Sequence, residues 1–144
     1  KRWRMPPRPK VCLVDTNVLL RYLLGDDPVQ SPRAAGFFRK VEDAALAVDL
    51  PDAVLAETIW VLEKGRQVPR PRIAALLIPL VLLKGVRAPR GKRSLVEALT
   101  TFAEDRFDFV DCLLAARARA GKSKVYTFDV TDFRRLKCEW EEPR

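Results

Sequence analysis

Four acidic side chains stand beside or within apolar segments, where an uncompensated carboxylate is costly. Asp15 follows the apolar run 11–14, and Asp129 follows the run 125–128. Glu57 and Asp111 each lie inside an apolar helical pattern. Converging carboxylates of this kind are the oxygen ligands that Mg²⁺ or Mn²⁺ prefers. We therefore expect a divalent metal site whose chemistry is hydrolysis of a phosphodiester bond.

Two of these acids also have structural explanations. Asp15, Thr16 and Asn17 all favour the N-cap of a helix. If Thr16 or Asn17 is the cap, Asp15 is free to point into a cleft. Glu57 shares a helix face with two valines, so it could be a solvated residue at the rim of an apolar stripe.

The other two acids have acidic neighbours that can take the structural role. Asp108 suits the N-cap of the helix that carries Asp111, so we assign the structural role to Asp108 and the metal-binding role to Asp111. A turn or a short-helix cap would account for either Asp129 or Asp132. Asp129 is nearer the strand end and is the better ligand candidate, with Asp132 as a second choice or an outer partner.

Length and composition favour one domain that binds a polyanion. The 144 residues are enough for a single core, which we place at 11–144, after a basic, disordered tail at 1–10. The net charge is +8, from 27 Lys and Arg against 19 Asp and Glu, although coding bias could also produce it. There are no histidines, which excludes His-ligated zinc and a Ser-His-Asp triad.

The cysteines and the hydropathy favour a cytoplasmic protein without a membrane span. Cys12, Cys112 and Cys138 have no CxxC spacing, so we interpret them as free thiols in a reducing cytoplasm. The longest apolar run, 73–83, falls short of the ~20 residues that a span needs. That run predicts either a central core helix or a helix buried against a second protomer or another protein.

Strands alternate with helices along the chain. The expected strands are 11–14, 45–48, 86–88, 125–128 and 136–140, and the expected helices are 17–24, 31–41, 51–64, 73–84, 94–104 and 108–120, with Gly121 as the last C-cap and a bend at Pro79. This order predicts an α/β fold, a three-layer α/β/α sandwich with a mainly parallel central sheet. Ligands of such sheets bind beyond the carboxyl ends of the strands, where Asp15 and Asp129 fall.

Four segments together resemble the PIN-domain ribonucleases, and among them the VapC toxins of type II toxin–antitoxin systems. The resemblance covers nearly everything from residue 11 onward, and its segments are 14–21 (VDTNVLLR), 56–62 (AETIWVL), 108–116 (DFVDCLLAA) and 127–129 (TFD). The chain departs from the family pattern in its basic N-terminal extension and in Cys112, where alanine is frequent.

The resemblance implies a function and a set of residues. It places the metal-binding acids on Asp15, Glu57, Asp111 and Asp129, with Asn17 and Thr127 as supporting polar residues around water or metal. It also implies Mg²⁺- or Mn²⁺-dependent cleavage of RNA, a homodimer, and a small antitoxin that occludes the site. Basic residues that could flank the cleft and hold phosphates are Arg21, Arg117, Arg119, Lys122 and Lys124. For any one of them a solvated helix face is the favoured interpretation, so we expect only some to contact RNA.

Three other functions stay open on the sequence. One is an RNA-processing PIN nuclease without an antitoxin. Another is a haloacid-dehalogenase-like phosphatase, although that chemistry wants an acid where Asn17 stands. The third is a non-catalytic binding module whose acids are only caps and surface charges.

Overall fold

The computed structural model describes residues 2–5, 7 and 9–144. The elements along the chain are β1 (Val11–Leu13), α1 (Thr16–Leu24), α2 (Gln30–Glu42), β2 (Ala47–Asp49), α3 (Asp52–Trp60), a π-helical turn η1 (Val61–Gly65), α4 (Arg70–Val81), β3 (Val86–Arg87), α5 (Lys92–Glu104), α6 (Phe109–Gly121), β4 (Val125–Tyr126), α7 (Val130–Arg135) and β5 (Trp140–Glu141). The predicted α/β class is confirmed, and the strand pairs found among the described residues are parallel.

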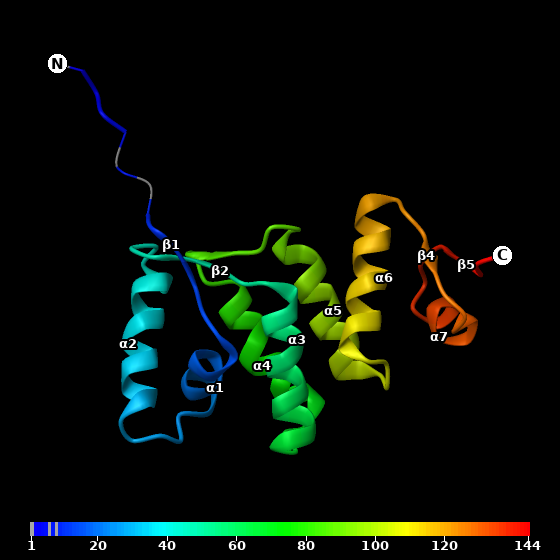
Figure 1. Cartoon of the computed structure of the whole chain (residues 1–144), viewed down its shortest axis with the longest axis horizontal. Helices are drawn as coiled ribbons and strands as arrows, with labels where there is room; N and C mark the ends of the chain where they lie inside the picture. The colour runs from blue at the N-terminus through cyan, green and yellow to red at the C-terminus, as the bar shows by residue number, and fades with distance from the viewer. Residues whose placement is uncertain (1, 6, 8) are drawn as a thin grey trace.

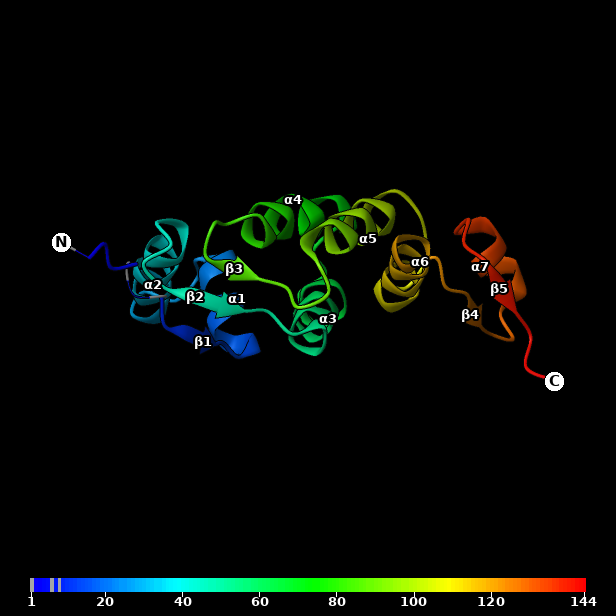
Figure 2. The same cartoon turned by 90° about the horizontal axis from the view of Figure 1, so that it is seen from above.

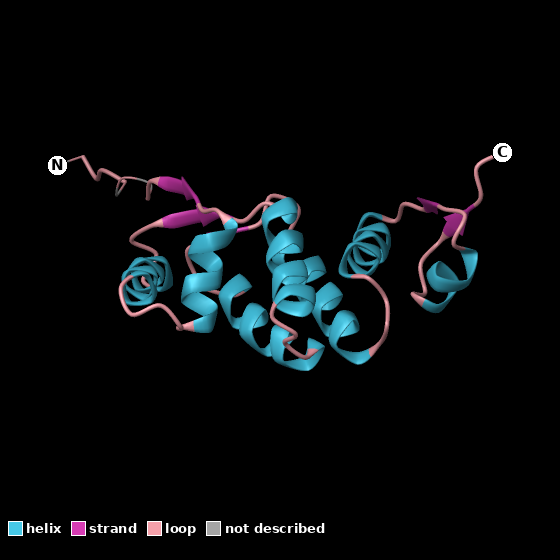
Figure 3. Cartoon of the chain, turned by 60° about the horizontal axis from the view of Figure 1, so that its bottom comes forward, coloured by secondary structure: helices cyan, strands magenta, loops and turns pink. Residues whose placement is uncertain are grey.

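The first three strands form one sheet in the order β1-β2-β3. Cys12 pairs with Val48, and Val48 pairs with Val86, so these three residues stand in register across the sheet. Val48 and Val86 are buried, because helices pack beneath the sheet (Figure 3). This arrangement leaves Asp15 just beyond the carboxyl end of β1.

Helices α4, α5 and α6 lie side by side and provide much of the hydrophobic core (Figure 2). Their fully buried side chains recur at helical spacing, as in Leu95, Leu99 and Phe102 of α5. In α4, Ile73, Leu77 and Leu80 are buried, whereas Ala75 on the same helix and the C-cap residue Leu82 are exposed. The apolar run at 73–83 is therefore chiefly a core helix, with one side left at the surface.

The remaining strands form a separate sheet at one end of the molecule. β4 and β5 pair with each other, and α7 lies against them (Figure 1). We call residues 11–121 the body and residues 125–141 the C-terminal unit. Both views place the unit beyond α6, away from β1 (Figures 1 and 2). The sheet is thus divided into two parts, a division that the alternation of strands and helices did not predict.

Several predicted boundaries were wrong by a few residues. Gly121 is the last residue of α6, and the left-handed cap position is Lys122 instead, at φ 52°. The last strand is Trp140–Glu141 rather than 136–140, because the six-residue helix α7 precedes it. Helix α4 continues on both sides of Pro79.

The tail prediction is only partly covered by the structure. Lys1, Pro6 and Arg8 lie outside the described residues, and the other residues of 1–10 belong to no helix or strand. Within the described residues, no helix combines the length and apolarity needed to cross a bilayer.

Candidate functional site

Three aspartates come together where α6, β4 and α7 meet. One carboxylate oxygen from each of Asp111, Asp129 and Asp132 lies within 4.8 Å of the others. Asp111 is in the first turn of α6, Asp129 is the N-cap of α7, and Asp132 is in the first turn of α7. We call these three residues the aspartate cluster.

Local hydrogen bonds set the geometry of the loop after β4. The backbone N–H of Asp129 donates to Thr127 Oγ1 at 2.9 Å. The Asp132 N–H donates to Asp129 Oδ1 at 3.4 Å, which is the capping contact of α7. Thr127 therefore holds the turn that presents Asp129.

The aspartate cluster is electrostatically self-repelling. The pKa of Asp111 is raised above its ordinary value by partial burial and then by the negative charges of Asp108, Asp129 and Asp132. The pKa of Asp132 is raised too, chiefly by desolvation and by its hydrogen bond to Asp129, while Arg135 opposes this. A bound divalent cation would remove this repulsion, and an all-carboxylate set suits Mg²⁺ or Mn²⁺. The residues present therefore fit such an ion.

A second acidic group lies at the carboxyl end of β1. Asp15 Oδ1 accepts the Val18 N–H at 3.1 Å, so Asp15 itself is the N-cap of α1. Of the two explanations that the sequence left open for Asp15, helix capping is the one found, and neither Thr16 nor Asn17 takes this role. Thr16 instead donates its hydroxyl to Glu57 Oε2 at 3.0 Å and joins the acid of α3 to the loop after β1.

Asp15 faces a hollow with basic side chains on its wall. The hollow has a volume of about 430 Å³ and is lined by Asp15, Asn17, Val18, Arg21, Gln30, Arg33, Ala34 and Phe37. Arg21 Nε donates to Gln30 Oε1 at 2.8 Å, which orients the guanidinium along this wall. Cationic side chains can bind the phosphates of a nucleic acid, and a carboxylate beside them can bind a divalent metal ion.

The four predicted acids do not form a single cluster in this conformation. Asp111 and Asp129 lie together with Asp132, whereas Asp15 and Glu57 form the second group. The reason is the divided sheet: β4 does not neighbour β1, so the carboxyl ends of the two strands do not meet. Burial also differs from expectation, since Asp15, Glu57 and Asp129 are exposed and only Asp111 is partly buried.

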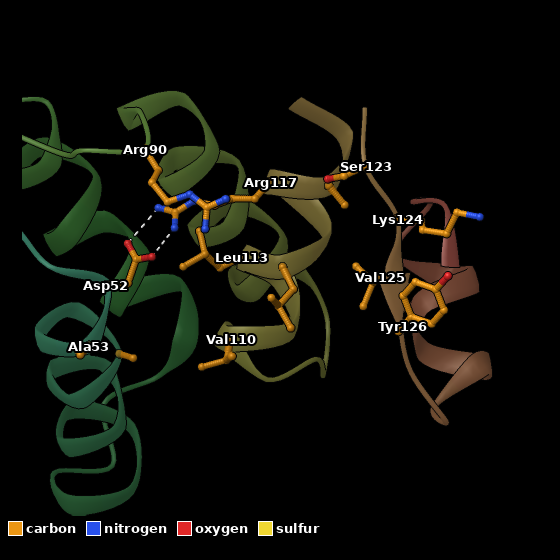
Figure 4. A pocket seen from close by; sticks show the side chains of 13 residues that line it. Asp52, Ala53, Arg90, Val110, Leu113, Arg117, Ser123, Lys124, Val125 and Tyr126 are labelled. Atoms are coloured by element: carbon orange, nitrogen blue, oxygen red, sulfur yellow. Dashed lines mark hydrogen bonds and ion pairs between the residues drawn. The ribbon is translucent and has the colours of Figure 1, made fainter. Parts of the chain in front are cut away.

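Most of the basic candidates have structural partners. Arg117 pairs through two nitrogens with Asp52 of α3 (Figure 4). Arg119 donates to the carbonyl of Leu136 at 2.5 Å, and Lys124 lies 3.9 Å from Glu141. Of the predicted phosphate contacts, Arg21 alone is on the wall of the hollow beside Asp15.

Sequence reasoning missed two residues near the acids. Thr16, expected only as a cap, holds Glu57 across 41 positions of sequence, and Arg33 shares the hollow with Asp15. Arg33 could have been found from its position in the first turn of a predicted helix that faces the loop after β1. The contact between Thr16 and Glu57 has no sequence pattern.

Comparison with protein families gives one match. The PIN domain family model matches residues 12–137. This range contains both acidic groups, the hollow beside Asp15 and the loop that carries Thr127. No curated protein shows significant similarity to the chain.

Proposed function

The chain belongs to the PIN domain family, a nuclease fold whose members are generally metal-dependent, and we propose that it is an endoribonuclease and the toxin of a VapC-like toxin–antitoxin pair. The observation that carries the proposal is the aspartate cluster, three carboxylates within 4.8 Å on the loop and helix ends next to β4. Its partners would be RNA, a small antitoxin and a second copy of the chain, and its place of action the cytoplasm.

The proposed metal ligands are Asp15, Glu57, Asp111 and Asp129. Asp132 would act as a further ligand or orient Asp129, and Asn17 and Thr127 would support the surrounding water. When bound, Mg²⁺ or Mn²⁺ supplies a water of lowered pKa and stabilises charge on the scissile phosphate. The absence of histidine from the chain is consistent with this mechanism, because the metal ion lowers the pKa of its bound water and no imidazole is needed as a base.

The chain's own residues would position the substrate. Arg21 and Arg33 on the wall of the hollow would hold phosphates on either side of the scissile bond. Thr16 would keep Glu57 oriented toward the loop after β1 by its 3.0 Å hydrogen bond. The net charge of +8 would draw RNA to the surface, and this attraction weakens with salt.

Cleavage of a single-stranded RNA by the purified chain tests the function. We expect cleavage with Mg²⁺ or Mn²⁺ and none with chelator. Asp111→Asn and Asp129→Asn should each lower the rate by about 100-fold or more, because the metal supplies several kcal/mol of charge stabilisation. Asp43→Asn is the control, since Asp43 is an exposed acid at the end of α2. Full activity of both cluster variants would refute the metal role.

The toxin role needs a separate experiment. Expression of the wild-type chain in a bacterium should arrest growth, whereas Asp111→Asn should not. A short open reading frame directly upstream of the gene, whose product relieves the arrest, would support the antitoxin assignment. Cleavage of RNA without growth arrest would instead favour an RNA-processing nuclease.

A further inference from the structure

Strand β1 has an unused edge. The backbone N–H of Ala47 in β2 donates to the carbonyl of Lys10 at 3.2 Å. Because main-chain groups alternate in direction along a strand, the groups of Val11 and Leu13 point away from β2. Nothing in the described part of the chain pairs with this side. The Val11 and Leu13 side chains are 46% and 74% exposed, which is unusual for apolar residues next to a core.

Strand β4 has an unused edge as well. The N–H groups of Val125 and Thr127 donate to β5 carbonyls, at 2.9 and 3.0 Å. The main-chain groups of Tyr126 therefore point to the opposite side, where no strand lies among the residues described. Tyr126 is 61% exposed and Phe128, just after the strand, is 79% exposed. A sheet of only two short strands is marginal in water.

The chain's own contacts keep its β4 away from its β1. Helix α6, directly before β4, packs on α5, where the ring of Phe109 meets that of Phe102 edge-on. Arg117 fixes the other side of α6 to α3 by its two-nitrogen pair with Asp52. A hollow of about 530 Å³ separates α3 from the start of β4, with Tyr126 on its far wall (Figure 4). With α6 held in this way, β4 lies beyond α6, away from β1 (Figures 1 and 2).

We propose that β4 of one chain pairs in parallel with β1 of a second copy, reciprocally, so that each functional site is built from two chains. Each copy has an unpaired edge on β4 and another on β1. When β4 of each copy pairs with β1 of the other, both edges are used and the assembly is a closed symmetric dimer. The two sheets would then join into one five-stranded parallel sheet with the order β5-β4-β1-β2-β3 on each side.

This pairing would complete the acidic site. Parallel strands have their carboxyl ends at the same edge of the sheet. Asp129, after β4 of one chain, would therefore lie beside Asp15, after β1 of the other. The chain that supplies Asp129 would also supply Asp111 and Asp132, which lie beside it. The chain that supplies Asp15 would also supply Glu57, which is hydrogen-bonded to Thr16 next to Asp15. The composite site rests on the nuclease function proposed above, whereas the strand pairing does not.

Apolar surfaces near both edges support the same partner. A hollow of about 530 Å³ at the end of β1 is lined by Leu13, Val14, Asp15, Val18, Pro51 and Val54. Parallel pairing brings the segment after β4 to this place, and the second residue of that segment is the exposed Phe128. Val110 and Leu114, one turn apart on α6, are 52% and 46% exposed and would cover the exposed side chains of β1. A second copy is thus complementary in both hydrogen bonds and apolar area.

The mass of the full chain in solution tests the pairing without reference to catalysis. Size-exclusion chromatography with light scattering should give twice the chain mass of 16.4 kDa. Tyr126→Pro should give a monomer, because proline removes the N–H on the free edge and leaves both β5 contacts of β4 in place. Tyr126→Ala, which keeps that N–H, is the matched control and should stay dimeric.

Three results would overturn the proposal. They are a monomeric wild type, a dimer that persists in Tyr126→Pro, and a Tyr126→Ala variant as monomeric as Tyr126→Pro. Circular dichroism and amide exchange verify that the body is folded in each variant. If Tyr126→Pro disturbs β5, Leu13→Pro tests the same β4–β1 pairing from the β1 side, with Leu13→Ala as its control. The solution mass of Leu13→Pro then decides whether the pairing exists.

Co-expression of two inactive variants tests the composite site. Asp15→Asn and Asp129→Asn homodimers should both be inactive. A mixed dimer would have both changes in one site and none in the other. With random pairing about half of the dimers are mixed, and half of their sites are intact, so equal mixing should restore about a quarter of wild-type activity. No recovery, with wild type active and dimeric, would mean that each site belongs to one chain. An inactive wild-type dimer would contradict the nuclease function and leave the pairing supported by mass.

Discussion

The body and the C-terminal unit contain the same kinds of element but differ in what stabilises them. The body contains most of the hydrophobic core, a cluster of aliphatic and aromatic side chains that runs from Val14, just after β1, through Ala116 of α6. In the unit, the buried hydrophobic side chains among the described residues are Phe133 and Leu136. These two side chains belong to the same hydrophobic cluster as the core of the body. The polar and cationic contacts between unit and body include Arg119 to the Leu136 carbonyl and Arg135 over the Phe107 ring at 5.4 Å.

This difference bears on function because the acids are divided between the two regions. Asp15 and Glu57 belong to the body, and Asp129 and Asp132 belong to the unit, with Asp111 on the helix that joins them. A weakly stabilised unit can change its contacts at low cost, and segments of this kind are common in parts of proteins that move or bind. The stability of each region can therefore be tested separately.

The largest effect is expected from Phe102→Ala in the body. Phe102 is 1% exposed, meets the Phe109 ring edge-on at 6.2 Å, and has the Arg70 guanidinium 4.2 Å above its ring centre. Removing a buried phenyl group leaves a cavity and costs about 3–5 kcal/mol. Urea denaturation should show this loss of unfolding free energy, with the whole body affected.

Phe133→Ala is the matched change in the unit, since Phe133 is 3% exposed. We expect the amides of 125–141 to lose protection from hydrogen exchange while the body loses less than about 1 kcal/mol, because local and global opening are separate. If both variants lowered the urea midpoint of the body equally, the two regions would form one cooperative unit.

An intermediate effect is expected from Arg70→Met. Arg70 Nη1 donates to the carbonyls of Asp105 and Phe107 at 2.9 and 2.6 Å, and Nε donates to Glu63 Oε2 at 2.6 Å. This side chain holds the connection between α5 and α6. Losing charged hydrogen bonds of this kind should cost about 2–3 kcal/mol in thermal or urea unfolding.

Arg70→Lys distinguishes charge from geometry. Lysine keeps the positive charge but cannot reproduce the planar fork of donors. We expect it to recover less than half of the lost stability. Complete recovery would show that the positive charge alone, rather than the three directed bonds, holds the connection.

Much of the body could be predicted from the sequence. The strand expected at 11–14 and the helix expected at 17–24 are found as β1 and α1, with Gly25 in a left-handed conformation at the helix end. Apolar periodicity and glycine punctuation determine such elements locally. Helix α7 was considered only as one explanation for Asp129 or Asp132 and was not among the expected helices, because six residues with one buried aromatic side chain show no helical periodicity.

The arrangement of the site was harder to predict than its residues. The apolar pattern of 125–128 is the same whether β4 lies beside β1 or apart from it. That choice depends on the packing of α6 against α5 and on the pair between Arg117 and Asp52, which are 65 positions apart. Local patterns contain no information on such contacts. Residue types alone therefore indicated an acidic site, but not its division into two groups.

The smallest effect is expected from Asp111→Asn in the absence of metal. The pKa of Asp111 is raised in the folded chain, first by desolvation and then by Asp108, Asp129 and Asp132. The folded state therefore binds more protons than the unfolded state above the ordinary aspartate pKa, and stability falls as pH rises through the raised value. Asparagine removes this penalty, so the variant should be more stable than wild type at pH 7.

The gain should be roughly a few tenths of a kcal/mol, because solvent screening weakens repulsion between partly exposed charges. It should disappear near pH 3, where the wild-type carboxyl is protonated in both states. Thermal unfolding of both proteins across this pH range, with chelator present, measures the difference. Added Mn²⁺ should reverse the order at pH 7, since only the wild-type cluster gains a bound cation that favours the folded state. An Asn variant that Mn²⁺ stabilises as strongly as wild type would mean that Asp111 does not hold the ion, whatever its pKa.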